Sequence, residues 1–283
     1  MCPLMDTEKA FEVIQTHIKN EEYDKVRPII DSIVSSSDDI HTLLKCASLL
    51  KVTEDEDGCQ EILDIVIDIS PGAEDKLTVA MSLRNLGRPD EAYELIKNEE
   101  GSDTISYEKA RTLTLMDEYE EALSVIRNIT SPNTDHRILL SEILCSLGEF
   151  REAYDISSQL VKDEPSYASL VNLCSAMIFM GKRKDAVRMV KQHMKEKKDA
   201  DSLALSAYVM RVDGRIPAAA AYAHRSLSAD HTHKGALETM AYCLIEKSRF
   251  IEAKIIAGAI NERCPGDPAA IRILDACRLA SGP

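Results

Sequence analysis

The chain has 283 residues, a formal net charge of −14 at pH 7 and 45% hydrophobic residues, with no tryptophan. Its acidity disfavours nucleic acid as a partner, because negative charge repels phosphate. No stretch of roughly 18 uncharged apolar residues and no basic, apolar leader occurs, so we expect no membrane span and a cytoplasmic location.

Apolar periodicity and turn residues predict seventeen helices, arranged as eight antiparallel pairs and one last helix. The pairs are predicted at 5–19 and 22–36, 38–52 and 56–69, 73–86 and 89–99, 103–116 and 119–129, 134–147 and 150–162, 166–180 and 183–196, 199–212 and 216–229, and 233–247 and 250–263. The last helix, predicted at 267–280, would cap the final pair. The corresponding repeats span about 5–36, 38–70, 73–101, 103–131, 134–165, 166–198, 199–231 and 233–265. We expect one domain over residues 1–283, because stacked helix pairs need no shared central core.

Two small residues recur in these pairs at a period near 34, one in each helix. The second helices carry Val26, Cys59, Ala92, Ala122, Ala153, Ala186, Ala219 and Ala253. Twelve residues before each of these lie Ile14, Ala47, Ala80, Ala110, Ser141, Cys174, Ala207 and Ala241. Two helices approach closely only where the side chains at their crossing are small. Both series are therefore predicted to be buried at helix crossings.

The turns inside the pairs have their own pattern. Gly87, Gly148, Gly181 and Gly214 follow first helices, where glycine adopts a left-handed conformation at little cost. Pro89 follows the first of these turns and is predicted to begin a second helix, a position at which proline is tolerated.

These features resemble the tetratricopeptide repeat (TPR) family over roughly Glu8–Pro265, most clearly in the segments LGRPDEAYELI, LGEFREAYDISSQLVKDEP and SRFIEAKIIAGAINERCPGDP. The resemblance implies an all-α fold, a right-handed α-α superhelix (TPR solenoid) of antiparallel helix pairs. The chain departs from the family pattern at the first repeat, where Ile14 and Val26 stand at the small positions, and at Asp117, which stands where glycine is usual. The third and fourth repeats are also short, and leucine or polar residues replace the usual aromatic residue early in the first helices.

The resemblance further implies that a protein or peptide partner binds in a concave groove lined by the first helices. The residues at the predicted groove positions include Arg84, Tyr107, Arg111, Glu142, Phe179, Tyr208, Arg211, Glu238 and Tyr242. We favour the later half of the groove, because Phe179, Tyr208 and Tyr242 are large aromatic residues of the kind that dominates interfaces. For the apolar groove positions Val171 and Ile178, packing between neighbouring first helices is an equally good interpretation.

Charge is distributed unevenly, with a net −18 over residues 1–150 and +4 over residues 151–283. On the predicted helix 183–196, four basic residues lie three or four apart and therefore share one outer face: Lys184, Arg188, Lys191 and Lys195. We call these four residues the basic stripe. Such a stripe is most often a solvated face, and otherwise it docks an acidic protein, RNA or the acidic half of a second copy.

No nucleophile elbow, phosphate-binding loop or dinucleotide-binding glycine motif occurs. We therefore expect a non-catalytic scaffold or adaptor without cofactors, including the role of assembly factor for a larger complex. The alternatives are an RNA-binding helical-repeat protein that uses the basic segment 182–198, and a self-assembling structural protein.

The sequence contains eight cysteines and a pair of neighbouring histidines, which are residue types able to form redox or metal sites. The cysteines show no spacing typical of zinc ligands, and two of them stand in the small-residue series, so we interpret them as buried thiols in a reducing compartment. A redox role for Cys2 or Cys264 is the alternative. His231 and His233 share one turn but lack a third ligand at a defined spacing, and we predict no metal site there.

Overall fold

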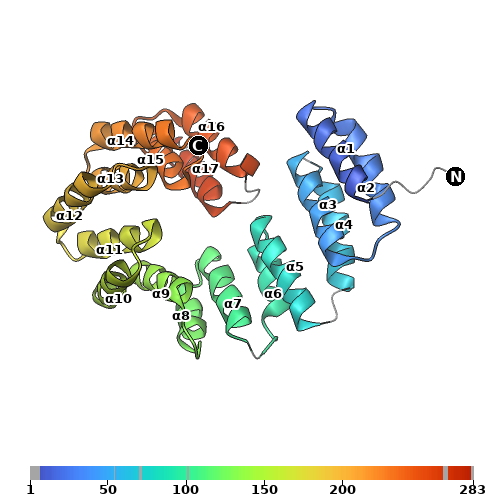
Figure 1. Ribbon diagram of the computed structural model, residues 1–283, viewed down its shortest axis with the longest axis horizontal. Coiled ribbons are helices and arrows are strands. Elements are labelled where there is room, and N and C mark those ends of the chain that lie inside the picture. Colours follow the sequence, from blue (N-terminus) through green and yellow to red (C-terminus); the bar gives the residue numbers. More distant parts are fainter. Residues whose placement is uncertain (1–6, 54, 70–71, 101, 264–266, 282–283) are drawn as a thin grey trace. The chain divides into compact units, whose positions relative to one another are not determined.

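The structure is a computed structural model that describes residues 7–53, 55–69, 72–100, 102–263 and 267–281 (Figure 1). Its first helices are α1 (Thr7–Lys19), α3 (Ile40–Val52), α5 (Ala73–Asn85), α7 (Asp103–Leu115), α9 (Thr134–Ser146), α11 (Tyr167–Phe179), α13 (Ala200–Val212) and α15 (Lys234–Ile245). The second helices are α2 (Val26–Val34), preceded by the short 3-10 helix η1 (Tyr23–Lys25), then α4 (Glu56–Asp68), α6 (Pro89–Ile96), α8 (Tyr119–Arg127), α10 (Phe150–Asp163), α12 (Arg183–Glu196), α14 (Ile216–Ala229) and α16 (Phe250–Arg263). The last helix is α17 (Pro268–Ser281). The described residues form no strand, and none of their helices is long and apolar enough to cross a bilayer.

Backbone contacts divide the chain into two compact units, residues 1–99 and residues 100–283, which we call the N-terminal and C-terminal units. The N-terminal unit contains α1 to α6, and the C-terminal unit contains α7 to α17. Within each unit successive helices lie side by side as pairs (Figure 1). The single domain expected over residues 1–283 stays a prediction.

The predicted small-residue series lies at the helix crossings. Of its sixteen members, fifteen have no exposed surface and Cys59 is only 3% exposed. Ser141 shows how a polar member is accommodated, because its hydroxyl group is hydrogen-bonded to Ser157 on the second helix of the same pair. The prediction of burial at the crossings is therefore confirmed.

The turns inside the pairs contain a residue with a left-handed backbone conformation even where glycine is absent. The four predicted glycines have φ angles between 78° and 83°. Asp117, Glu21 and Ser248 occupy corresponding turns with φ angles of 61°, 59° and 57°. Packing of the two helices thus imposes this conformation on residues that adopt it at a cost.

Most first helices begin at a residue whose side chain accepts a hydrogen bond from the third backbone N–H group of the helix. Asp39, Ser102, Asn133, Ser166, Asp199 and His233 act in this way. Such caps satisfy a donor that would otherwise be unpaired, and they fix where each first helix begins.

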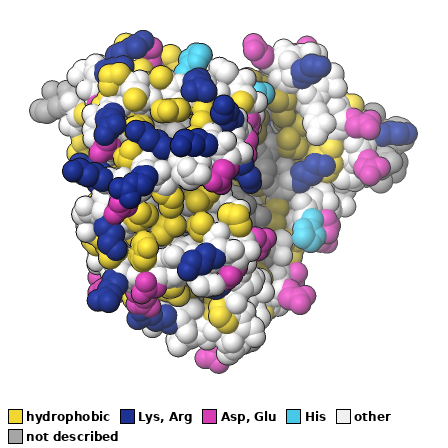
Figure 2. Space-filling model, turned by 60° about the vertical axis from the view of Figure 1, so that its left-hand side comes forward, with side chains coloured by type: hydrophobic (Ala, Val, Ile, Leu, Met, Phe, Trp, Pro, Cys, Tyr) yellow, Lys and Arg dark blue, Asp and Glu magenta, His cyan; other side chains and the backbone are white. Residues whose placement is uncertain are grey.

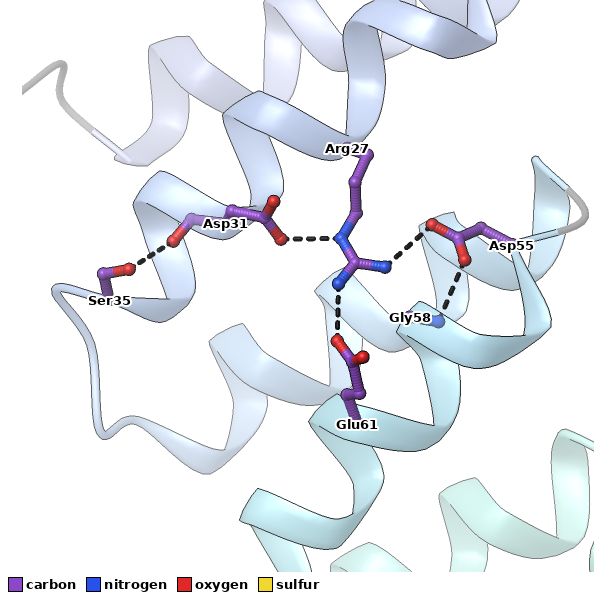
Figure 3. Close-up of polar contacts among 6 residues, drawn as sticks. All are labelled: Arg27, Asp31, Ser35, Asp55, Gly58 and Glu61. Carbon is purple, nitrogen blue, oxygen red and sulfur yellow. Dashed lines mark hydrogen bonds and ion pairs between the residues drawn. The ribbon is translucent and has the colours of Figure 1, made fainter.

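The N-terminal unit has an aliphatic core and an ion cluster between its first two repeats. Ile14, Ile30, Leu43, Leu63 and Ile96 are among the fully or almost fully buried side chains of this core. At the surface of the unit, Arg27 of α2 forms ion pairs with three carboxylates (Figure 3).

The Arg27 cluster joins α2 to α4. Its Nε lies 2.7 Å from Asp31 Oδ1, its Nη1 lies 3.0 Å from Asp55 Oδ2, and its Nη2 lies 2.5 Å from Glu61 Oε2. A Cβ atom on Gly58 would lie 2.0 Å from Arg27 Nη1, so a glycine at this position leaves room for the guanidinium group. The N–H group of Gly58 and the Arg27 side chain both lower the pKa of Asp55.

The C-terminal unit has buried clusters of its own. Its central cluster includes Cys174, Ala186, Leu205, Val209 and Ala219, all fully buried. At its end, α17 packs against α15 and α16 and buries Ala270, Ile273 and Cys277. The last helix therefore covers the final pair, as a cap is expected to do.

Candidate functional site

The C-terminal unit contains a cleft of about 610 Å³, lined mainly by the first helices of its later repeats and by the cap helix. Glu142 of α9, Val171 and Asn172 of α11, Tyr208 of α13, Glu238 of α15 and Arg272 of α17 all line it. Equivalent faces of consecutive first helices turn inward together because each repeat stacks on the next in nearly the same orientation. The cleft is therefore a product of the repeat architecture.

One wall of the cleft is a cluster of two tyrosines and an arginine. The guanidinium carbon of Arg211 lies 5.9 Å from the ring centroid of Tyr208 and 4.9 Å from that of Tyr242. The hydroxyl group of Tyr208 lies 2.6 Å from Ser175 Oγ, which fixes this ring, and burial raises the pKa of Tyr208. Arg211 Nε is buried and has no hydrogen-bond partner among the residues that the structure describes. Cation–π contacts hold this side chain in place of an ion pair.

A second part of the lining is built around Tyr167. Its ring stands edge-on to His233, with the two ring centroids 4.9 Å apart. A Cβ atom on Gly235 would lie 2.0 Å from the hydroxyl oxygen of Tyr167, so a glycine in the first turn of α15 is what admits the ring. His233 accepts a hydrogen bond from the N–H group of Ala236 and lies 2.9 Å from Asp201 Oδ1. His233, for which the sequence predicts no metal site, therefore caps the N-terminus of α15.

Two carboxylates face the cleft from different helices. The pKa values of Glu142 and Glu238 are both raised, chiefly because burial within the cleft walls disfavours the charged form. Glu142 is nevertheless an exposed residue, and Glu238 is half-buried. Arg272 Nη2 lies 3.9 Å from Glu238 Oε1, at the outer limit for an ion pair.

The structure brings six of the residues at predicted groove positions together in this cleft: Glu142, Val171, Tyr208, Arg211, Glu238 and Tyr242. Phe179 does not line it. Its side chain is 59% exposed and stacks on Phe150, with ring centroids 5.1 Å apart.

The earlier groove candidates lie outside the cleft. Tyr107 packs against His136, with ring centroids 4.8 Å apart, and Arg111 lies over the Tyr107 ring at 5.6 Å. Arg84 belongs to the N-terminal unit, where it is only 7% exposed and donates a hydrogen bond to Asn85.

Sequence reasoning missed two important residues of the cleft, Tyr167 and Arg272. Tyr167 precedes the predicted groove positions by one turn of helix, and Arg272 belongs to a helix interpreted only as a cap. The glycine in the first turn of α15 was the available signal for Tyr167, because a glycine within a helix often marks a close approach by another group.

The basic stripe is fully accessible. All four side chains of the stripe are exposed on α12, and Figure 2 shows Lys and Arg side chains gathered on the side of the molecule that carries this helix. Arg188 lies 3.4 Å from Asp185, whereas Lys184, Lys191 and Lys195 form no ion pair with any described acidic residue.

The described cysteines are free thiols. Cys46, Cys59, Cys174, Cys243 and Cys277 are buried, and Cys145 is half-buried. Burial raises the pKa of Cys145 to about 11 and that of Cys174 to about 12. Both values favour the unreactive protonated form at neutral pH. Cys2 and Cys264 lie outside the described residues, and within those residues no group of three or more His, Cys, Asp or Glu side chains could hold a metal ion.

The architecture resembles solved TPR structures. A tetratricopeptide repeat protein from Parabacteroides merdae has a TM-score of 0.56 and 12% sequence identity, over 84% of this chain and 98% of that chain. Yeast Tom70 has a TM-score of 0.50 and 13% identity, over 92% of this chain and 59% of Tom70. No protein-family model matches the sequence, and a search of curated proteins gives no match. The helix pairs, their buried small residues and these structural neighbours together show that the chain has the all-α helical-repeat fold of the tetratricopeptide repeat proteins.

Proposed function

We propose that the protein is a non-catalytic interaction scaffold or adaptor that binds a segment of a partner protein in the cleft of the C-terminal unit. The observation that carries this proposal is the aromatic and charged lining of the cleft, contributed by α9, α11, α13, α15 and α17. A cleft that crosses several parallel helices offers successive contacts to an extended segment.

The side chains in the cleft are of the types that contribute most to protein interfaces. Tyrosine and arginine bury much surface and lose little conformational freedom when a partner binds. Tyr208 and Arg211 are already held in place by Ser175 and by Tyr242, so little further ordering is needed. We therefore propose Tyr208, Arg211 and Tyr242 as partner contacts.

Site-specific photo-crosslinking in the native cell tests the proposal. A photoreactive amino acid placed at Val171, inside the cleft, is expected to crosslink a partner that mass spectrometry then identifies. The matched control is the same amino acid at Gln192, which is exposed on α12 outside the cleft. A partner crosslinked at 192 and not at 171 would move the binding surface to the outer face.

A second contact surface is proposed at the basic stripe. Three of its lysines have no acidic partner among the described residues, so their charge is available to an acidic protein surface. The stripe and the cleft lie on different helices, and a scaffold could use both at once.

A further inference from the structure

The two glutamates of the cleft are only weakly paired with basic residues. Glu142 forms no ion pair with any residue that the structure describes, although Arg272, Lys234 and Arg111 act on it from a distance. Lys234 is committed elsewhere, because its ammonium group lies 2.8 Å from Asp267 Oδ2. Glu142 therefore has no basic partner within ion-pair distance among the described residues, and Glu238 has only Arg272, at 3.9 Å.

Arg272 is a basic side chain of the chain itself that lies beside Glu238 in the cleft. The side chain projects from the cap helix, is 60% exposed, and lies 3.9 Å from Glu238. It also acts electrostatically on Glu142, across the cleft from α9 to α17. A guanidinium group thus already lies beside Glu238 and acts on Glu142, but most of its side chain faces water.

The walls suit a long cationic side chain. Tyr167, Tyr208 and Tyr242 all line the same cleft. Aromatic rings pack against the methylene groups of lysine and arginine and also attract their charged ends. The cleft therefore combines an apolar passage for the stem with carboxylates for the charged group.

Arg211 is a further cation that lines the cleft, and it would favour an acidic ligand instead. Its guanidinium group is stacked with Tyr208 and Tyr242. It can therefore bind a backbone carbonyl group or an acidic residue of the same segment.

We infer that the cleft binds a lysine or arginine side chain of an extended protein segment, held by Glu142 and Glu238 in the place that Arg272 now occupies. This inference rests on the proposed function, since it names the chemistry of the segment that the cleft accepts. Arg272 then acts as an internal competitor that the ligand displaces.

Selection of phage-displayed random dodecapeptides on the immobilised full chain tests the inference. We expect enriched peptides to share a lysine or arginine at one fixed position. A labelled peptide from this set should bind the double variant Glu142→Gln, Glu238→Gln at least about tenfold more weakly. The matched control, Glu149→Gln, changes an exposed glutamate outside the cleft and should bind like the parent.

Arg272→Ala provides a test that misfolding cannot imitate. Removal of the competitor should tighten binding of the same cationic peptide several-fold, whereas weaker binding would overturn the inference. Enriched peptides that are acidic or show no charge preference would also overturn it while leaving the proposed groove intact. Failure to enrich any peptide on the parent, together with no crosslink at 171, would count against the proposed function itself.

Discussion

In the N-terminal unit, acidic side chains stabilise contacts between repeats, whereas in the C-terminal unit Glu142 and Glu238 line a cleft in which their one ion pair among the described residues is the 3.9 Å contact of Glu238 with Arg272. The N-terminal unit has 22 acidic and 10 basic residues, and yet Arg27 gathers three of these carboxylates in one cluster. The C-terminal unit is nearly neutral overall, with 26 acidic and 24 basic residues, and still leaves Glu142 and Glu238 poorly compensated. Net charge therefore says little about which carboxylates are paired.

The carboxylates of the Arg27 cluster and those of the cleft also differ in the direction of their pKa shifts. In the Arg27 cluster hydrogen bonds lower the pKa of Asp55, while in the cleft burial raises the pKa values of Glu142 and Glu238. A lowered pKa indicates an acid whose charge stabilises the fold, and a raised one indicates an acid whose charge opposes it. Acids of the second kind are retained at a cost in stability, which is typical of binding sites.

The largest effect is expected from a substitution at a close helix crossing of the C-terminal unit. Ala219→Leu inserts a large side chain at a fully buried crossing and should lower the free energy of unfolding by about 1–3 kcal/mol. Ala221→Leu changes an exposed alanine of the same helix and serves as the control. Equal thermal midpoints for the two variants would contradict the packing argument.

The next largest effect concerns binding. Tyr242→Ala removes one ring that stacks on Arg211, and we expect it to weaken binding of the crosslinked partner by about 1–2 kcal/mol. Phe179→Ala, which removes an aromatic ring outside the cleft, should have a smaller effect. Titration calorimetry distinguishes them, and a larger loss for Phe179→Ala would move the site out of the cleft.

In the N-terminal unit, Arg27→Gln should lower the free energy of unfolding by about 1 kcal/mol at pH 7, because three carboxylates lose their common partner. The pKa of Asp55 is lowered in the folded state, so this stabilisation is present above the ordinary pKa of aspartate, about 4, and is lost as the pH falls through the lowered value. Hydrogen exchange of α2 and α4 monitors this stabilisation when it is measured at pH 7 and at about pH 3, with correction for the intrinsic exchange rates. A cost that persists unchanged in acid would show that the ion cluster contributes nothing.

The cleft should respond to pH in the opposite direction. The raised pKa values of Glu142 and Glu238 mean that ionisation opposes folding, an effect absent below the ordinary pKa of glutamate and complete once the pH exceeds the raised values. The double variant Glu142→Gln, Glu238→Gln should therefore unfold at a slightly higher temperature than the parent at pH 7, and the difference should shrink in acid. A lower midpoint at pH 7 would mean that the two carboxylates stabilise the fold after all.

The smallest effect is expected at the basic stripe. Lys184→Glu combined with Lys191→Glu should modestly reduce recovery of an acidic partner, because both side chains are exposed and screened by salt. Recovery by the parent should then fall as salt rises from 50 to about 300 mM, a range over which surface charges are increasingly screened. Recovery that is independent of salt and unchanged in the variant would identify the stripe as a solvated face.

Local sequence signals were sufficient for the helix pairs. The sixteen small positions, the turn glycines and the helix boundaries follow from periodicity and capping, which involve residues within one or two turns of each other. Part of the cleft was also predictable, because Tyr208, Arg211 and Tyr242 stand at inward positions of two neighbouring first helices. Burial of the described thiols followed from their places in the same pattern.

Only the tertiary structure decided the remaining features, since they join residues that are distant in sequence and share no periodic pattern. Arg27 binds Glu61 from the next repeat, and Tyr167 fits against Gly235 two repeats later. Arg272 lies beside Glu238 and acts on Glu142 from a helix that the sequence predicts only as a cap for the final pair. Stacking of one repeat on the next sets these distances, so the charge environment of Glu142 and Glu238 was not readable from the sequence around either residue.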